Sequence, residues 1–330
     1  MSSRLVRTFR SQSRALKDSD ISKQANVIRI GALVVASVMP LCSNGASAGN
    51  EQELKLGGSN VRIEFESLPS PSLRKLVIEW VTTSARAVSI YYERFPVRDV
   101  RIGIRFFEGH GTRFGRASGW NGASITMDVG TLNAASDFAK DWEMTHEMVH
   151  LAFPSVAESH HWIEEGIATY VEPIARARAG NLREEKVWGD LVDGLPQGLP
   201  KAGDRGLDFT PTWGRTYWGG ALFCLLADVE IRKRTQNARG LEDALRAILD
   251  SGGTIASDWQ LTKALHIGDD ATGVDVLSKL YEKMKAEPVT VDLERLWQQL
   301  GVKQEAGRIY FDDSAPLAKI RRAITQKVES

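Results

Sequence analysis

Cysteine and net charge are what this sequence has least of. Only two of its 330 residues are cysteine, and 42 basic side chains balance 42 acidic ones. Without a basic stripe interleaved with aromatic residues, we expect no nucleic-acid partner. Cys42 lies in the N-terminal stretch described next, so Cys224 would be the one thiol of a processed chain and no internal disulfide could form. The apolar run ALFCLLA around Cys224 predicts a small core residue rather than a nucleophile.

The N-terminus also lacks an apolar run long enough to cross a bilayer as a helix, which takes about 20 residues. The run IGALVVASVMPL, at 30–41, follows a basic region and precedes Ala46 and Ala48, which match the A-x-A cleavage pattern. That order predicts a secretory signal peptide at 1–48. The protein would then be exported to the periplasm or the outside of the cell, with no stable membrane span after cleavage. A buried core helix or an uncleaved membrane anchor is the alternative.

No internal repeat or low-complexity segment interrupts the predicted elements. Strands are expected first, and a helix separates the first two of them; a loop rich in glycine, arginine and aromatic residues precedes the third, which would lie near a sheet edge. In chain order these are a strand at 61–67, a helix at 69–95, a strand at 100–108, a loop at 109–122 and a strand at 123–130.

Helices follow, and Pro154 is expected to end the first of them. They are predicted at 136–153, 160–179, 181–192 and 215–235, with a loop at 193–212 and further amphipathic helices to the C-terminus. Strands followed by helices without alternation predict an α+β fold. We expect a lobe over 49–154 that contains a small mixed sheet and the first of these helices, and then a helical lobe over 155–330.

The sequence HEMVH, at 146–150, carries the clearest chemical signal. Residues four apart share one face of a helix, so His146 and His150 can point at one ion. Glu147 is turned by about 100° from His146 and would lie beside the metal, where a carboxylate can take a proton from a water molecule. The apolar neighbours of the two histidines predict that this helix is buried.

A third ligand is expected from WIEEGIATYVE, at 162–172. A catalytic zinc takes three protein ligands and keeps one open position, and two histidines with one glutamate form a known set. Glu165 is favoured because Gly166 would let its helix approach the HEMVH helix closely, whereas Glu164 would point about 100° away. The remaining alternatives, Glu158, His160 and His161, lie in the connection between the helices and would be held less rigidly.

HEMVH followed by WIEEGIATY resembles the gluzincin peptidases, in particular the aminopeptidase N-like and glycyl aminopeptidase-like branch called peptidase MA-like. The resemblance implies a thermolysin-like zincin fold and a zinc peptidase acting on peptide or protein substrates. His146, His150 and Glu165 would bind one Zn²⁺, and Glu147 would be the general base. The turn between the two helices is shorter here than in the larger family members.

The resemblance also bears on residues around the metal. Tyr217 begins a stretch similar to the Y-x-K-G segment that carries the family's catalytic tyrosine, with Gly219 in place of the lysine. Tyr217 would donate to the developing oxyanion, and Tyr170 is the runner-up, more typical of the core. Thr169 and Glu172 lie on the Glu165 face of their helix and could hold a ligating imidazole by its other nitrogen.

The family's aminopeptidases use a G-A-M-E-N edge strand, whose glutamate binds the substrate's free amine. The corresponding segment here, GASIT at 122–126, has no acid in that place, and Asp128 is nearest. An edge strand could still bind an extended peptide through its backbone. Trp120 and Trp142 could line a groove, but core packing is the better expectation for both.

Two other functions remain open from the sequence. One is a non-catalytic zinc-binding protein of the same fold that binds a peptide or a cell-envelope partner, which the partial tyrosine match and the missing amine anchor favour. The other is a helical interaction module without metal, in which the histidine spacing would be coincidental. The sequence leaves the oligomeric state open.

Overall fold

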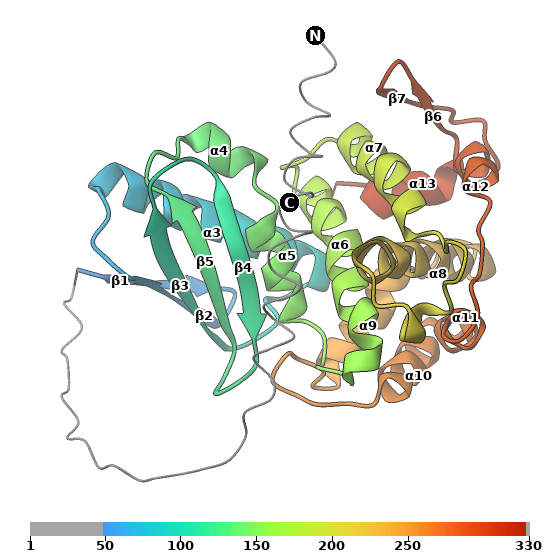
Figure 1. The fold of residues 1–330 in the computed structure, drawn as a ribbon, viewed down its shortest axis with the longest axis horizontal. Coiled ribbons are helices and arrows are strands. Elements are labelled where there is room, and N and C mark those ends of the chain that lie inside the picture. The colour runs from blue at the N-terminus through green and yellow to red at the C-terminus, as the bar shows by residue number, and fades with distance from the viewer. Residues whose placement is uncertain (1–48, 328–330) are drawn as a thin grey trace. The chain divides into compact units, whose positions relative to one another are not determined.

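A five-stranded mixed sheet begins the part of the chain that the computed structural model describes, residues 49–327. Its strands are β1 (Glu51–Leu56), β2 (Ser59–Phe65), β3 (Asp99–Phe107), β4 (Thr112–Ser118) and β5 (Ser124–Gly130). They lie in the order β1-β2-β3-β5-β4 (Figure 1). β2, β3 and β5 are parallel, and the edge strands β1 and β4 are antiparallel to their neighbours. The predicted mixed sheet and α+β class are confirmed.

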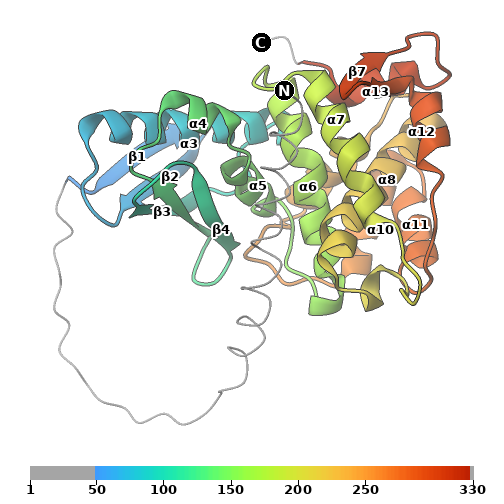
Figure 2. The ribbon, with the colours of Figure 1, turned by 45° about the horizontal axis from the view of Figure 1, so that its top comes forward.

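One face of this sheet is buried under helices. Alternate apolar residues of β2, β3 and β5 are buried, among them Ile63, Ile102 and Met127. The helix α3 (Pro71–Tyr92) begins where the Ser70 side chain accepts a hydrogen bond from the backbone nitrogen of Leu73, a common helix start. α3 and α4 (Ala135–Lys140) lie on the same side of the sheet (Figure 2).

The position of the edge strand differs from the prediction. β4 lies inside the segment predicted as the loop 109–122, and β5, which contains most of GASIT, is paired on both sides instead of lying near an edge. β4 shows no alternation of apolar residues, because none of the residues of its sequence TRFGRAS is fully buried and three of them are exposed. A bulge between Arg113 and Arg116 further breaks its period.

The helix predicted at 136–153 is in fact two helices, α4 and α5 (Glu143–His150). The backbone of Asp141 is extended, with ψ of 141°, and its carboxylate accepts hydrogen bonds from the backbone nitrogen of Met144 at 3.2 Å and from Nε1 of Trp80 at 2.8 Å. The extended backbone of Asp141 therefore ends α4, and its carboxylate caps the start of α5 and ties it to α3.

Helices make up most of the remainder. They are α6 (His161–Arg178), α7 (Glu184–Gly194), α8 (Gly220–Arg234), α9 (Leu241–Asp250), α10 (Leu261–Thr272), α11 (Val276–Met284), α12 (Leu293–Leu300) and α13 (Ala318–Thr325). Short turns of other helix types are η1 (Glu158–His160), η2 (Leu195–Gly198), η3 (Leu207–Phe209) and the π-helix η4 (Gly214–Gly219), which continues into α8. The hairpin β6 (Val302–Glu305) and β7 (Arg308–Phe311) was not predicted.

A buried network of charges joins α6, α8 and α9. The guanidinium of Arg232 donates to Asp228 at 2.8 Å and to Glu242 at 2.7 Å, and Arg178 donates to Glu242 at 3.0 Å. The Tyr170 hydroxyl donates to Asp228 at 2.9 Å, and Tyr170 is fully buried. The expectation that Tyr170 belongs to the core is confirmed, as is that for Cys224, which is 1% exposed.

The predicted signal peptide, 1–48, with Cys42, lies outside the described residues. Everything described falls within one compact unit, Ser47–Ser330, and the boundary at residue 154 stays a prediction. Within residues 49–327, no helix combines the length and apolarity needed to cross a bilayer.

Candidate metal centre

Two histidines lie one helical turn apart on α5. The ring centroids of His146 and His150 are 4.9 Å apart, and the rings are nearly perpendicular, at 83°. The side chain of His146 is 6% exposed and that of His150 is 13% exposed. These are therefore not two solvated histidines on a surface helix, and buried imidazoles need polar partners.

Glu165, in the first turns of α6, reaches both rings with one carboxylate oxygen. Its Oε2 lies 3.2 Å from Nε2 of His146 and 3.7 Å from Nε2 of His150. One ligand atom from each of the three residues lies within 4.8 Å of the other two. The Oε1 of Glu164 instead accepts a hydrogen bond from the backbone nitrogen of Val156 at 3.2 Å.

These three side chains fit a zinc ion. Two imidazole nitrogens and one carboxylate oxygen are a zinc donor set, and bonds of about 2.0–2.1 Å in a tetrahedron place the ligand atoms about 3.3 Å apart. The distances of 3.2 and 3.7 Å from the Glu165 oxygen to the two nitrogens are close to that spacing. Although burial favours its neutral form, His150 and the hydrogen bonds of His146 and His161 lower the pKa of Glu165.

Gly166 brings α6 close to a different helix from the one predicted. We expected it to face the HEMVH helix, but a Cβ at Gly166 would lie 2.4 Å from the Cα of Gly220, the first residue of α8. A Cβ at Gly220 would in turn lie 2.2 Å from the carbonyl oxygen of Trp162. Because neither glycine has a side chain, the helix that follows η4 packs directly on the helix that carries Glu165.

Glu147 lies beside the three candidate ligands and against β4. Its Oε2 accepts a hydrogen bond from the backbone nitrogen of Ala117 at 2.6 Å. Gly115 leaves room for this side chain, since a Cβ there would lie 3.0 Å from Cγ and Oε1 of Glu147. Burial raises the pKa of Glu147, which suits a group that must take up and release a proton near neutral pH.

Tyr217 faces the same centre from η4. Its ring stacks on that of His146, with centroids 6.4 Å apart and an interplanar angle of 21°. Burial, with the negative charges of Glu165 and Glu147, raises the pKa of Tyr217, so the phenol is neutral and can donate a hydrogen bond at neutral pH. π-helical turns occur often at functional sites.

The two residues expected to support an imidazole make different contacts. Glu172 is buried and accepts a hydrogen bond from Nη1 of Arg176 at 2.8 Å. Burial alone would lower the pKa of His146, but the net pKa is raised, chiefly by Glu165. The charge of Glu172 adds a smaller contribution to this rise. The Thr169 hydroxyl is buried, and no protein partner within the described residues accepts or donates to it. Their roles at the metal therefore stay predictions.

The sequence predicts His161 only as a weakly held alternative ligand, but the structure holds it against two glutamates of α6. Its Nε2 lies 3.3 Å from Oε1 of Glu165, the oxygen that faces away from the two candidate ligands, and its Nδ1 lies 2.8 Å from Oε2 of Glu164. The spacing of four between His161 and Glu165 on α6 was the available signal. Gly115 and Ala117 were missed because β4 was not recognised as a strand.

The two tryptophans expected to pack in the core are exposed instead. Trp120, in the turn between β4 and β5, is 82% exposed, and Trp142, just before α5, is 46% exposed. Trp142 and His146 form a T-shaped ring pair, with centroids 5.4 Å apart. Both residues precede turns or helix starts, where the apolar spacing of the sequence no longer reports burial.

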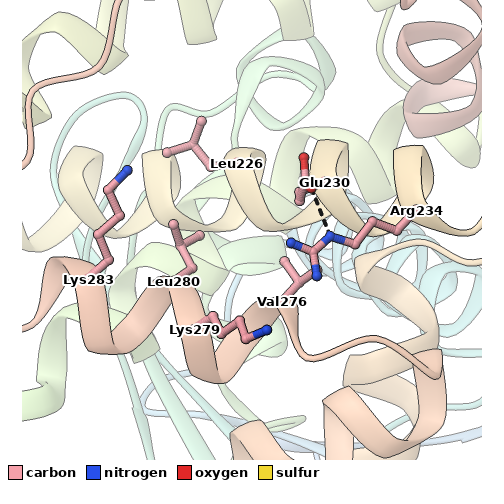
Figure 3. Close-up of a pocket in the computed structure, with 7 residues that line it drawn as sticks. All are labelled: Leu226, Glu230, Arg234, Val276, Lys279, Leu280 and Lys283. Carbon is pink, nitrogen blue, oxygen red and sulfur yellow. Dashed lines mark hydrogen bonds and ion pairs between the residues drawn. The ribbon is translucent and has the colours of Figure 1, made fainter.

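A hollow of about 160 Å³ between α8 and α11 lies apart from these residues (Figure 3). Leu226, Val276 and Leu280 contribute its apolar lining. At its rim the guanidinium of Arg234 is bound to Glu230 at 2.8 Å. None of the candidate ligands lines this hollow, so it does not compete with the His-His-Glu cluster as the chemical site.

Solved structures resemble the chain in fold, but sequence comparison finds no relative. No protein-family model matches the chain, and no curated protein matches its sequence. Among solved structures, the chain is similar to an aminopeptidase N family protein from Idiomarina loihiensis, with a TM-score of 0.56 and 13% identity over 77% of this chain and 50% of that one. An M1 zinc metallopeptidase from Deinococcus radiodurans gives a TM-score of 0.48 and 16% identity over 73% of this chain and 52% of that one.

The chain spans about half the length of these structures. The likeness to the Idiomarina loihiensis protein shows that the chain has the fold of the aminopeptidase N catalytic region, at low sequence identity. The predicted structural resemblance to that branch of zinc peptidases is therefore confirmed.

Proposed function

We propose that this chain is an exported zinc-dependent peptidase. The observation that carries the proposal is the meeting of His146, His150 and Glu165 within 4.8 Å of one another. Glu147 and Tyr217 lie beside this cluster, and the fold is that of a zinc peptidase catalytic region. The N-terminal signal pattern supports export.

The three ligands would hold one zinc ion, which in such sites supplies Lewis acidity toward a carbonyl oxygen and lowers the pKa of a water molecule. Glu147 takes the proton of the attacking water on its carboxylate and passes it to the nitrogen of the leaving amine, so that the peptide C–N bond breaks and one water is consumed. Its hydrogen bond from the Ala117 backbone nitrogen holds one oxygen, which leaves Oε1 as the proton acceptor.

Tyr217 donates its hydroxyl proton in a hydrogen bond to the carbonyl oxygen as negative charge develops there. The buried setting strengthens this interaction, because fewer water molecules compete for the same oxygen. The substrate would be a peptide or protein segment. Among the described residues, β4 is an edge strand of the sheet next to Glu147, which accepts the N–H of Ala117. An extended peptide can add to the remaining edge through backbone hydrogen bonds.

The test is peptide hydrolysis by zinc-loaded protein, with Glu147→Gln as the inactive variant. We expect the wild-type protein to cleave a mixed peptide library and Glu147→Gln to bind zinc equally but to lose cleavage. Hydrolysis that persists in Glu147→Gln would refute the assigned base. Full zinc binding with no cleavage by the wild-type protein would favour the non-catalytic zinc protein instead.

A further inference from the structure

His161, the first residue of α6, lies between two carboxylates of its own helix. Its Nδ1 is 2.8 Å from Oε2 of Glu164, and its Nε2 is 3.3 Å from Oε1 of Glu165. The second oxygen of Glu164 accepts a hydrogen bond from the backbone nitrogen of Val156 at 3.2 Å. The second oxygen of Glu165 faces His146. The ring of His161 therefore joins the turn that follows α5 to the candidate ligand on α6.

Helix stability does not explain a histidine at this position. A carboxylate oxygen can only accept a hydrogen bond, so a ring whose two nitrogens face carboxylates donates from both and is cationic. A cation is unfavourable at the N-terminus of a helix, where acidic side chains are preferred. The side chain of His161 is also 46% exposed, and exposed ion pairs add little to stability. The reason for the contact with Glu165 must lie at the metal centre instead.

The oxygen that His161 contacts is the one that has to stay away from the metal. Only Oε2 of Glu165 lies near both imidazoles, 3.2 Å from Nε2 of His146 and 3.7 Å from Nε2 of His150. A carboxylate that is free to rotate can bind a metal through both oxygens. The second oxygen would then take the position that a catalytic zinc keeps open. A cationic ring beside Oε1 opposes this rotation, because it attracts that oxygen and repels a metal ion that approaches it.

We propose that His161 is a positioning residue, which holds Glu165 as a one-oxygen ligand and so keeps the fourth position of the zinc open. This inference rests on the proposed function and adds to it a residue that acts only through Glu165. Partners that orient a metal ligand typically change metal affinity by about 10–100-fold. The effect of His161 should therefore appear in zinc binding and coordination more than in folding.

Two substitutions separate the contact with Glu165 from the contact with Glu164. The side-chain amide nitrogen of glutamine lies near the place of Nε2 in histidine, and that of asparagine lies near the place of Nδ1. His161→Gln thus keeps a donor for Glu165, whereas His161→Asn keeps one for Glu164 alone. We expect the zinc dissociation constant, measured by competition with a chelator, to rise about tenfold or more in His161→Asn and His161→Ala. In His161→Gln it should rise about threefold or less.

Cobalt in place of zinc reports the coordination number without turnover. Wild-type protein and His161→Gln should show the intense visible absorption of four-coordinate Co²⁺. His161→Ala should show the weaker absorption of five-coordinate Co²⁺, because Glu165 then binds through both oxygens. His160→Ala is the matched control, since this neighbouring histidine lies 3.1 Å from Asp208 and not beside a candidate ligand. It should leave the zinc dissociation constant and the cobalt spectrum unchanged.

The outcomes separate this inference from the proposed function. Equal zinc affinity and equal cobalt spectra in wild-type protein and His161→Ala would overturn the positioning role and leave the zinc site intact. Equal losses in His161→Gln and His161→Asn would also overturn it, because the donor to Glu165 would then make no difference. A wild-type protein that takes up neither metal would refute the proposed function, and this inference with it.

Discussion

Replacing Gly166 with alanine should separate the two helices that bring Glu165 and Tyr217 together. The new Cβ would lie 2.4 Å from two backbone atoms of Gly220, its Cα and its carbonyl carbon. Carbon atoms normally approach to about 3.5–4.0 Å, so α6 and the helix that follows η4 would have to move apart by about 1 Å. Because the obstructing atoms belong to the backbone, a rotamer change cannot relieve the contact.

This displacement should lower both the stability of the protein and its catalytic rate. Overpacking of this kind costs about 1–3 kcal/mol of unfolding free energy, which the better helix propensity of alanine offsets by about 1 kcal/mol. The catalytic cost is larger, because a misplacement of about 1 Å can lower the rate by about 100-fold. We therefore expect Gly166→Ala to lose more activity than its stability loss explains.

The assay is denaturant unfolding together with kcat/KM and zinc content. Gly189→Ala is the matched control, since it places a Cβ in α7 at 3.3 Å from Cγ1 of Ile309, a side-chain atom that can move. The control should retain activity and wild-type stability. If Gly166→Ala kept both wild-type kcat/KM and wild-type stability, the glycine contact would not set the position of Tyr217, and that part of the reasoning would be wrong.

Three further outcomes are expected. Tyr217→Phe should lower kcat by about 10²–10³ while zinc content stays equal, and unchanged kcat would remove Tyr217 from the mechanism. Gly115→Ala should crowd the Glu147 carboxylate, at 3.0 Å, and lower kcat about tenfold or more with zinc retained; an unaffected pH–rate profile and kcat would contradict this. The arginines around buried Glu242 lower its pKa from 4.5 to about 2 against the opposing effect of burial. Its contribution to stability is therefore present above pH 4.5 and lost as the pH falls toward 2, on the order of 3 kcal/mol. Acid unfolding of Glu242→Gln should be less steep with pH in that range, and an equal slope would contradict the assignment.

The parts of the fold that the sequence predicted are those with strong periodicity. β2, β3 and α6 were placed within a few residues because alternate or helically spaced apolar residues mark one buried face. β4 could not be found in this way, since none of its residues TRFGRAS is fully buried and its bulge breaks the period. The break between α4 and α5 depends on a hydrogen bond from Trp80, which is 61 residues away from Asp141 and invisible to local spacing.

At the metal centre, too, local spacing predicted the residues of one helix but not their contacts with other elements. The spacing of four between His146 and His150 specifies a shared helix face, and the choice of Glu165 over Glu164 followed from the rotation of one helix. Which helix Gly166 contacts is a tertiary property, and the sequence-based choice of the HEMVH helix was wrong. The exposure of Trp120 and Trp142 also depends on what packs near them, since tryptophan is common in cores as well as in binding sites.

The central claim is that two imidazoles from α5 and one carboxylate from α6 bind one zinc ion. Zinc-edge X-ray absorption on the purified protein, with His146→Ala beside it, tests this most directly. We predict one zinc per chain, with two imidazole nitrogens and carboxylate or water oxygens at about 2.0–2.1 Å, and loss of that signal in His146→Ala. A sulfur ligand at about 2.3 Å, or an unchanged spectrum in His146→Ala, would show that the metal binds elsewhere and would contradict the account.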